Sequence, residues 1–177
     1  MAQKYAVTVR KLAYSALCLA LCLVLPFVTG QVPQVGSMLC PMHLPVLLAG
    51  FLCGPWWALA VGFIAPLLRN LLFGMPPIVT AIAMSFELAT YGLVCGILYN
   101  MLRKNVLNVY ISLVAAMIAG RVVWGIVMLI ISGATNSVFG WGVFVSGAVL
   151  NALPGIALQI ILIPVIVMAL RKAKIIK

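Results

Sequence analysis

The chain has 177 residues, of which 66% are hydrophobic and 7% charged, and its net charge is +10. Soluble domains carry about 25% charged residues, so a chain this small cannot hide so much apolar surface from water, and we expect lipid to be its solvent. Such a basic balance would suggest nucleic acid in a soluble protein, but here the cations stand at the ends of apolar segments and are expected to set membrane topology instead.

Six apolar segments follow one another along the chain, separated by clusters of Gly, Pro and polar residues. They predict one membrane domain, residues 1–177, with helices at about 12–29, 43–54, 56–73, 78–101, 106–131 and 141–170. The first run is too long for a signal peptide and no clear cleavage site follows it, so we expect a retained helix. The second segment is short for a crossing, which needs about 20 residues. It spans only if part of the preceding loop, Gly30–Met42, dips into the membrane and lines a protein cavity.

The positions of the cations predict the topology. With a cytoplasmic N-terminus and six crossings, nine of the eleven cations fall on the cytoplasmic side and the three outer loops carry none, as the positive-inside rule requires. The nine are Lys4, Arg10, Lys11, Arg103, Lys104, Arg171, Lys172, Lys174 and Lys177. Five crossings would place the basic tail outside. We therefore expect an all-α integral membrane protein, a bundle of six transmembrane helices with both termini in the cytoplasm.

Glu87 carries the only carboxylate side chain of the chain, and it stands inside the fourth apolar segment. An acid within hydrocarbon is costly and by default marks a site with a partner. Arg121, deep in the fifth segment, is the candidate partner. At 1.5 Å per residue, Glu87 lies about 12 Å below the outer surface, and Arg121 and Asn151 each about 15 Å. Arg69 stands near the outer end of the third segment. The sequence therefore predicts a polar layer in the outer half of the membrane.

Two interpretations of this layer remain open. Glu87 and Arg121 can form a structural ion pair that fixes helix packing. Alternatively, they can line a solute pocket in which Arg121 or Arg69 meets an anion and Glu87 accepts from hydroxyls or amines. Arg69 can equally snorkel to the outer headgroups. His43, the only histidine, starts the second segment, where it can meet backbone, water or the solute. Trp124 lies deeper than the other tryptophans and can stack on a ligand ring.

Neither a metal site nor an active site is expected. The five cysteines have no metal-binding spacing, and one histidine cannot build a metal site alone. They are Cys18, Cys22, Cys40, Cys53 and Cys95. The chain has no HExxH, GxSxG or Walker A motif. The single acid and the single histidine are expected at different depths, which argues against a general acid paired with a general base. We predict no enzyme activity, no cofactor and no ATP hydrolysis by this chain.

Small residues recur on the first helix at Ala13, Ala16 and Ala20. The last two form a small-xxx-small pair, which lets another helix approach closely.

With this layout, the chain resembles the substrate-binding S components of energy-coupling factor (ECF) vitamin transporters. The resemblance covers most of the chain. It rests on six crossings in under 200 residues, on basic termini, on Ala16-x-x-x-Ala20, and on two phrases, His43-Leu-Pro-Val-Leu-Leu-Ala-Gly-Phe-Leu-Cys-Gly and Val61-Gly-Phe-Ile-Ala-Pro-Leu. The second of the six helices, which holds the first phrase, looks most like the pantothenate and riboflavin branches.

The resemblance implies that the first-helix face of Ala16 and Ala20, and also Ala13, contacts a separate transmembrane coupling subunit. Two ATPase subunits would supply the energy, in a bacterial plasma membrane. The loop Gly30–Met42 would cap the solute, and helices four to six would supply much of the pocket. Nickel and cobalt S components use an N-terminal His, which Met1-Ala2-Gln3 lacks, so metal uptake is not expected.

The predicted function is therefore high-affinity binding and uptake of a small water-soluble vitamin. Pantothenate fits best because a deep Arg suits an anion and Glu87 can take its hydroxyls; riboflavin and pyridoxine are alternatives. The predicted site is Glu87, Arg121, Asn151, Arg69, His43 and Trp124. An alternative function of a different class is that of a membrane assembly subunit, in which the polar layer only packs helices. A secondary carrier ranks lower, because no inverted repeat is evident.

Overall fold

The computed structural model describes residues 2–28, 38–103, 105–135 and 152–176, and in those ranges it holds six helices and no strand. Their bounds are α1 Ala2–Val28, α3 His43–Cys53, α4 Pro55–Phe73, α5 Ile78–Met101, α6 Val106–Thr135 and α8 Leu153–Lys172. Five of these are long and apolar enough to cross a membrane, and α3 is too short. The first helix begins about ten residues before the predicted start, while part of the sixth predicted helix, 141–151, lies outside the described residues.

Glycine and proline set the helix ends. Gly54 has φ +90°, and Pro55 follows as the first residue of α4, where its missing N–H costs nothing. Gly74 ends α4 in the left-handed conformation, and its N–H donates to the Asn70 carbonyl at 2.8 Å. The Asn70 side chain then donates to the Pro76 carbonyl at 2.7 Å, which holds the turn between α4 and α5.

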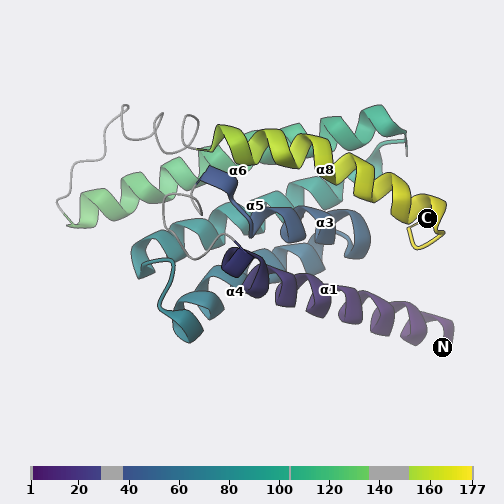
Figure 1. Ribbon diagram of the computed structural model, residues 1–177, viewed down its shortest axis with the longest axis horizontal. Coiled ribbons are helices and arrows are strands. Elements are labelled where there is room, and N and C mark those ends of the chain that lie inside the picture. Colours follow the sequence, from purple (N-terminus) through teal and green to yellow (C-terminus); the bar gives the residue numbers. More distant parts are fainter. Residues whose placement is uncertain (1, 29–37, 104, 136–151, 177) are drawn as a thin grey trace.

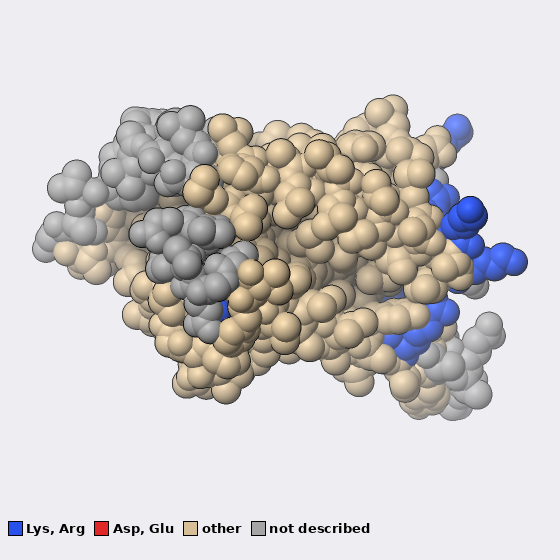
Figure 2. Space-filling model, viewed as in Figure 1, with Lys and Arg blue, Asp and Glu red and all other residues tan. Residues whose placement is uncertain are grey.

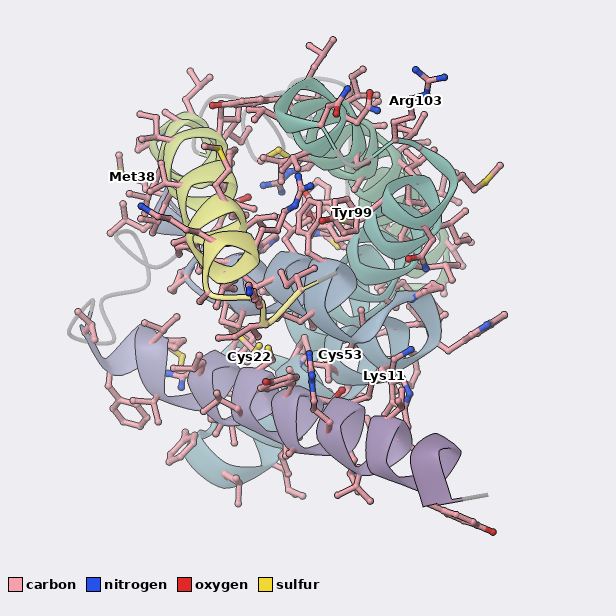
Figure 3. All side chains as sticks on the ribbon, turned by 90° about the vertical axis from the view of Figure 1, so that its right-hand side faces the viewer. Lys11, Cys22, Met38, Cys53, Tyr99 and Arg103 are labelled. Carbon is pink, nitrogen blue, oxygen red and sulfur yellow. The ribbon has the colours of Figure 1, made fainter. Side chains whose placement is uncertain are left out.

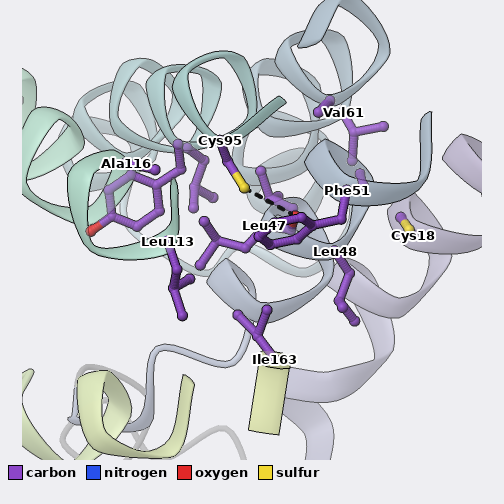
Figure 4. Close-up of a cluster of buried hydrophobic side chains, with 14 of the residues drawn as sticks. Cys18, Leu47, Leu48, Phe51, Val61, Cys95, Leu113, Ala116 and Ile163 are labelled. Carbon is purple, nitrogen blue, oxygen red and sulfur yellow. Dashed lines mark hydrogen bonds between the residues drawn. The ribbon is translucent and has the colours of Figure 1, made fainter. Parts of the chain in front are cut away.

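The long helices lie roughly side by side, and both ends of the chain lie at the same end of the bundle (Figure 1). The short helix α3 is the core element: nine of its eleven residues are buried, and it packs against α1, α4, α5 and α8. Figure 3, an end view, shows the longer helices around it. Cys95 of α5 contacts the Leu47 carbonyl at 3.8 Å within this core (Figure 4).

Helices α4 and α5 pack with their backbones in contact. A Cβ placed on Gly92 would lie 2.6 Å from backbone atoms of Ala58, and one on Gly96 would lie 2.6 Å from the Pro55 nitrogen. Small residues serve this purpose in membranes, where helix association depends on close van der Waals packing rather than on water. This contact fixes α5, the helix that carries Glu87, against its neighbour.

The outer surface of the bundle is apolar along its length and basic at one end. Large side chains such as Ile118, Leu129 and Ile161 are more than half exposed, as expected of groups that face lipid. Lys and Arg gather at the end where both termini lie, and no Asp or Glu is visible on the face shown (Figure 2). At that end Arg10 of α1 donates to the Ile175 carbonyl, which joins the two ends of the chain.

Candidate functional site

The carboxylate of Glu87 is buried inside the bundle, with 1% of the residue exposed. It is the tenth residue of α5, about 14 Å along that helix. The Nη1 atom of Arg121, on α6, lies 3.0 Å from its Oε1 atom. The pairing expected from helix rise is therefore present. Because the Arg121 side chain is only 16% exposed, both charges are largely removed from solvent.

Two further side chains converge on the same oxygen. The Tyr91 hydroxyl, one turn further along α5, donates to Glu87 Oε1 at 3.1 Å. His43, the first residue of α3, places its Nε2 atom 3.4 Å from Oε1, though without a hydrogen bond. The rings of His43 and Tyr91 meet edge to face, with centroids 5.2 Å apart. Three helices thus bring a guanidinium, a phenol and an imidazole to one carboxylate oxygen.

The meeting of His43 and Glu87 corrects one expectation. The sequence predicted that the single acid and the single histidine would lie at different depths; this was wrong, because they are 3.4 Å apart. The error came from placing the start of the second helix at the membrane surface. Helix α3 instead begins beside the middle of α5, and residues 38–42 lead the chain inward to that level.

The irregular backbone before α3 is satisfied by protein groups. Cys40 adopts φ +47°, and its carbonyl accepts from the His43 N–H at 3.1 Å. The Cys22 thiol of α1 donates to the Met42 carbonyl at 3.5 Å. Arg121 Nη2 lies 3.7 Å from the Cys40 sulfur. Backbone that does not form a helix is tolerated at membrane depth only when protein or a water-filled cavity surrounds it, and the first condition holds here.

Gly120 makes room for the tyrosine of the cluster. A Cβ at this position of α6 would overlap the Tyr91 ring. The residue next to Arg121 must therefore be small if the phenol is to reach Glu87. Neither Gly120 nor Tyr91 was predicted from the sequence. The spacing of four between Glu87 and Tyr91, which places two residues on one helix face, could have pointed to the tyrosine.

Several nitrogen atoms of the cluster have no hydrogen-bond partner within the described ranges. They are both ring nitrogens of His43 and the Nε atom of Arg121, all shielded from solvent. A buried polar group that is left unsatisfied is costly and calls for an explanation in the structure. Chemically, these atoms suit a partner that carries hydrogen-bond acceptors.

Arg69 lies elsewhere in the contact between α1 and α4. It is 3% exposed, its Nη1 atom donates to the Leu23 carbonyl at 2.5 Å, and its guanidinium lies over the rings of Phe27 and Phe73 at 5.0 and 5.4 Å. Pro26 stands in the same turn of α1 and has no N–H to donate to the Cys22 carbonyl. The described contacts of Arg69 run to these helices rather than to Glu87.

The remaining predicted residues take different positions. Trp124 is half-buried on α6, three residues after Arg121, and Asn151 lies outside the described residues. Ala13, Ala16 and Ala20 are exposed on α1. In the part of the chain that the structure describes, no group of three His, Cys, Asp or Glu side chains could hold a metal ion. The roles of these residues stay predictions.

A family model described as ECF transporter, substrate-specific component, matches residues 10–167. No curated protein and no solved structure matches the chain.

Proposed function

This chain belongs to the family of ECF transporter substrate-specific components, and we propose that its solute is a small water-soluble vitamin, with pantothenate the best candidate. Membership makes it a solute-binding transport subunit that works with ECF partners. It also places the chain among multi-pass membrane proteins, in agreement with its five long apolar helices. The observation that carries the choice of solute is the buried cluster around Glu87.

The free edge of Arg121 supports an anionic solute. Its Nη1 atom is taken by Glu87 at 3.0 Å. The other edge, formed by Nε and Nη2, has only the weak 3.7 Å contact with the Cys40 sulfur among the described contacts. A guanidinium edge presents two parallel donors, the geometry that a carboxylate accepts best. The His43 ring, whose Nε2 atom lies 3.4 Å from Glu87 Oε1, makes no hydrogen bond within the described ranges and can add a donor to the same solute.

The second interpretation, an assembly subunit with a purely structural ion pair, has less support. A structural cluster gains most when every polar atom in it is satisfied, because a half-satisfied network is worse than an apolar core. Here Glu87 Oε1 has three neighbouring groups, while both His43 nitrogens and Arg121 Nε lack hydrogen bonds within the described ranges. That imbalance favours a solute. Riboflavin and pyridoxine remain alternative solutes.

We further propose six crossings with both termini in the cytoplasm. Residues 38–53, the inward segment plus α3, would make the second crossing. The basic end of the bundle supports this orientation, because Lys and Arg accumulate in cytoplasmic loops. The exposed side of α1 at Ala16 and Ala20 would contact the transmembrane coupling subunit, and two ATPase subunits would drive uptake in a bacterial plasma membrane.

A binding assay on the detergent-solubilised chain tests the proposal. Pantothenate, riboflavin and pyridoxine are added separately and thermal unfolding is followed. A ligand at 100 times its Kd stabilises the folded state by about 2.7 kcal/mol. We expect pantothenate to raise the melting temperature of the wild type and of Arg103→Lys, an exposed control. Arg121→Lys, which keeps the charge but loses the planar donor edge, should lose most of that rise. If none of the three vitamins stabilises the wild type, the proposed function is wrong.

A further inference from the structure

Gln159 is a buried polar side chain outside the Glu87 cluster. It lies on α8 with 2% of the residue exposed, and its Oε1 atom has no hydrogen-bond partner within the described ranges. An amide oxygen shielded from water and left without a donor destabilises the fold. Such a residue indicates that a bound molecule supplies the missing hydrogen-bond donor.

The position of Gln159 along α8 places it near the start of α3. Four residues before it, Gly155 packs against the inward segment, since a Cβ there would lie 2.7 Å from the carbonyl oxygens of Met38 and Leu39. Four residues after it, Ile163 points into the core beside α3 (Figure 4). Residues four apart share a helix face. Gln159 therefore faces the same side as both, about 6 Å along the axis from each.

The contacts of α3 agree with this position of Gln159 along the bundle. Its first residue, His43, falls in the chain between Leu39, which meets Gly155, and Leu47, which belongs to the same buried cluster as Ile163. The amide of Gln159 consequently lies on the α8 side of the region where α3 begins and where His43 reaches Glu87. The carboxylate cluster and the unpaired amide oxygen are therefore at a similar level along the bundle, on different helices.

The two groups offer opposite hydrogen-bonding character. Arg121 Nε is a donor without an acceptor, and Gln159 Oε1 is an acceptor without a donor. Glu87 is predicted from the sequence to accept from the solute hydroxyls, but three side chains already approach its Oε1 atom. We propose that Gln159 is the residue that accepts a hydrogen bond from a hydroxyl of the bound solute, and that it selects hydroxylated solutes. This inference rests on the proposed function.

Two ligands and two variants test it. The ligands are pantothenate and N-(3,3-dimethylbutanoyl)-β-alanine, which keeps the carboxylate and the amide but lacks both hydroxyls. The variant Gln159→Met keeps the approximate volume and removes the acceptor; Leu158→Met, on the half-exposed neighbour, is the control. We expect the wild type and the control to bind pantothenate about 10 to 100 times more tightly than the analogue, the range for a lost buried hydrogen bond. In Gln159→Met the two ligands should bind with nearly equal, weak affinity.

The unliganded proteins give a second readout. Because Met leaves no unpaired acceptor, Gln159→Met without ligand should melt at the same temperature as Leu158→Met or higher. A lower melting temperature would show that the amide is satisfied in the unliganded fold and would overturn the inference. If Gln159→Met still prefers pantothenate over the analogue as strongly as the wild type does, this inference is overturned while the proposed function stands. A wild type that binds none of pantothenate, riboflavin and pyridoxine would overturn the proposed function and this inference with it.

Discussion

Removing one member of the Glu87–Arg121 pair should destabilise the protein far more than removing both. At an effective dielectric constant of about 20, unit charges 3.0 Å apart attract each other by about 5.5 kcal/mol. Arg121→Met leaves the buried carboxylate with Tyr91 and His43 alone, and Glu87→Gln leaves a buried guanidinium without a counter-charge. Each single change should cost about 3–5 kcal/mol, the usual penalty for an uncompensated buried charge.

The double variant Glu87→Gln/Arg121→Met has no unpaired charge and should recover most of the lost stability. The measurement is the free energy of unfolding in mixed detergent micelles for the wild type, both single variants and the double variant. We expect an interaction energy above about 2 kcal/mol from this cycle. If the two single effects add to the double effect within about 0.5 kcal/mol, Glu87 and Arg121 are not coupled and this prediction is wrong. Pantothenate binding by the double variant, once folded, should be lost if the pair also contacts solute.

Three other substitutions have expected outcomes. Gly120→Ala presses a methyl group into the Tyr91 ring and should lower the free energy of unfolding by about 1–3 kcal/mol, as overpacking does. Arg69→Met leaves the Leu23 carbonyl without its charged donor and should cost about 1–3 kcal/mol, measured in the same way. Ala20→Leu fills an exposed face of α1, so melting temperature should not change while co-purification with the coupling subunit falls.

Matched control substitutions test whether these effects are specific to the positions chosen. Gly133→Ala also lies on α6, but a Cβ there meets nothing within 4 Å, so it should be neutral or stabilise by up to about 1 kcal/mol. If Gly120→Ala changes the free energy of unfolding as little as Gly133→Ala does, Tyr91 is not held against the α6 backbone. Ala157→Leu enlarges an exposed alanine of α8. Equal loss of the coupling subunit in Ala157→Leu and Ala20→Leu would argue against a specific α1 face.

The helices and the ion pair were predictable because both depend on local chemistry. Gly54 with Pro55, and Gly74 with Pro77, end helices through backbone geometry that these residues carry into any fold. The pairing of Glu87 with Arg121 followed from helix rise, since two charges in apolar helices at one depth have few other partners. A straight helix converts sequence distance into depth.

The depth of His43 was not predictable in the same way. Residues 40–42 do not form a helix, so sequence distance along them does not convert into depth, and α3 begins wherever its packing against α1, α5 and α8 places it. Gln159 was overlooked for a different reason. It is a single polar residue in an apolar helix, which could have been noticed, but whether its oxygen is paired depends on contacts between distant segments.

The short helix α3 explains why a polar cluster can exist in this bundle at all. A full-length helix at the same place would have filled the core with apolar side chains from one membrane face to the other. Because α3 starts halfway, its first residue, His43, and the segment before it reach the level of Glu87 and Arg121. The helix N-terminus also points its partial positive charge toward a carboxylate, which is favourable. The half-length of α3, which is too short to span a membrane by itself, is thus the feature that leaves unpaired polar atoms of α3, α6 and α8 in the interior, where we propose that the solute binds.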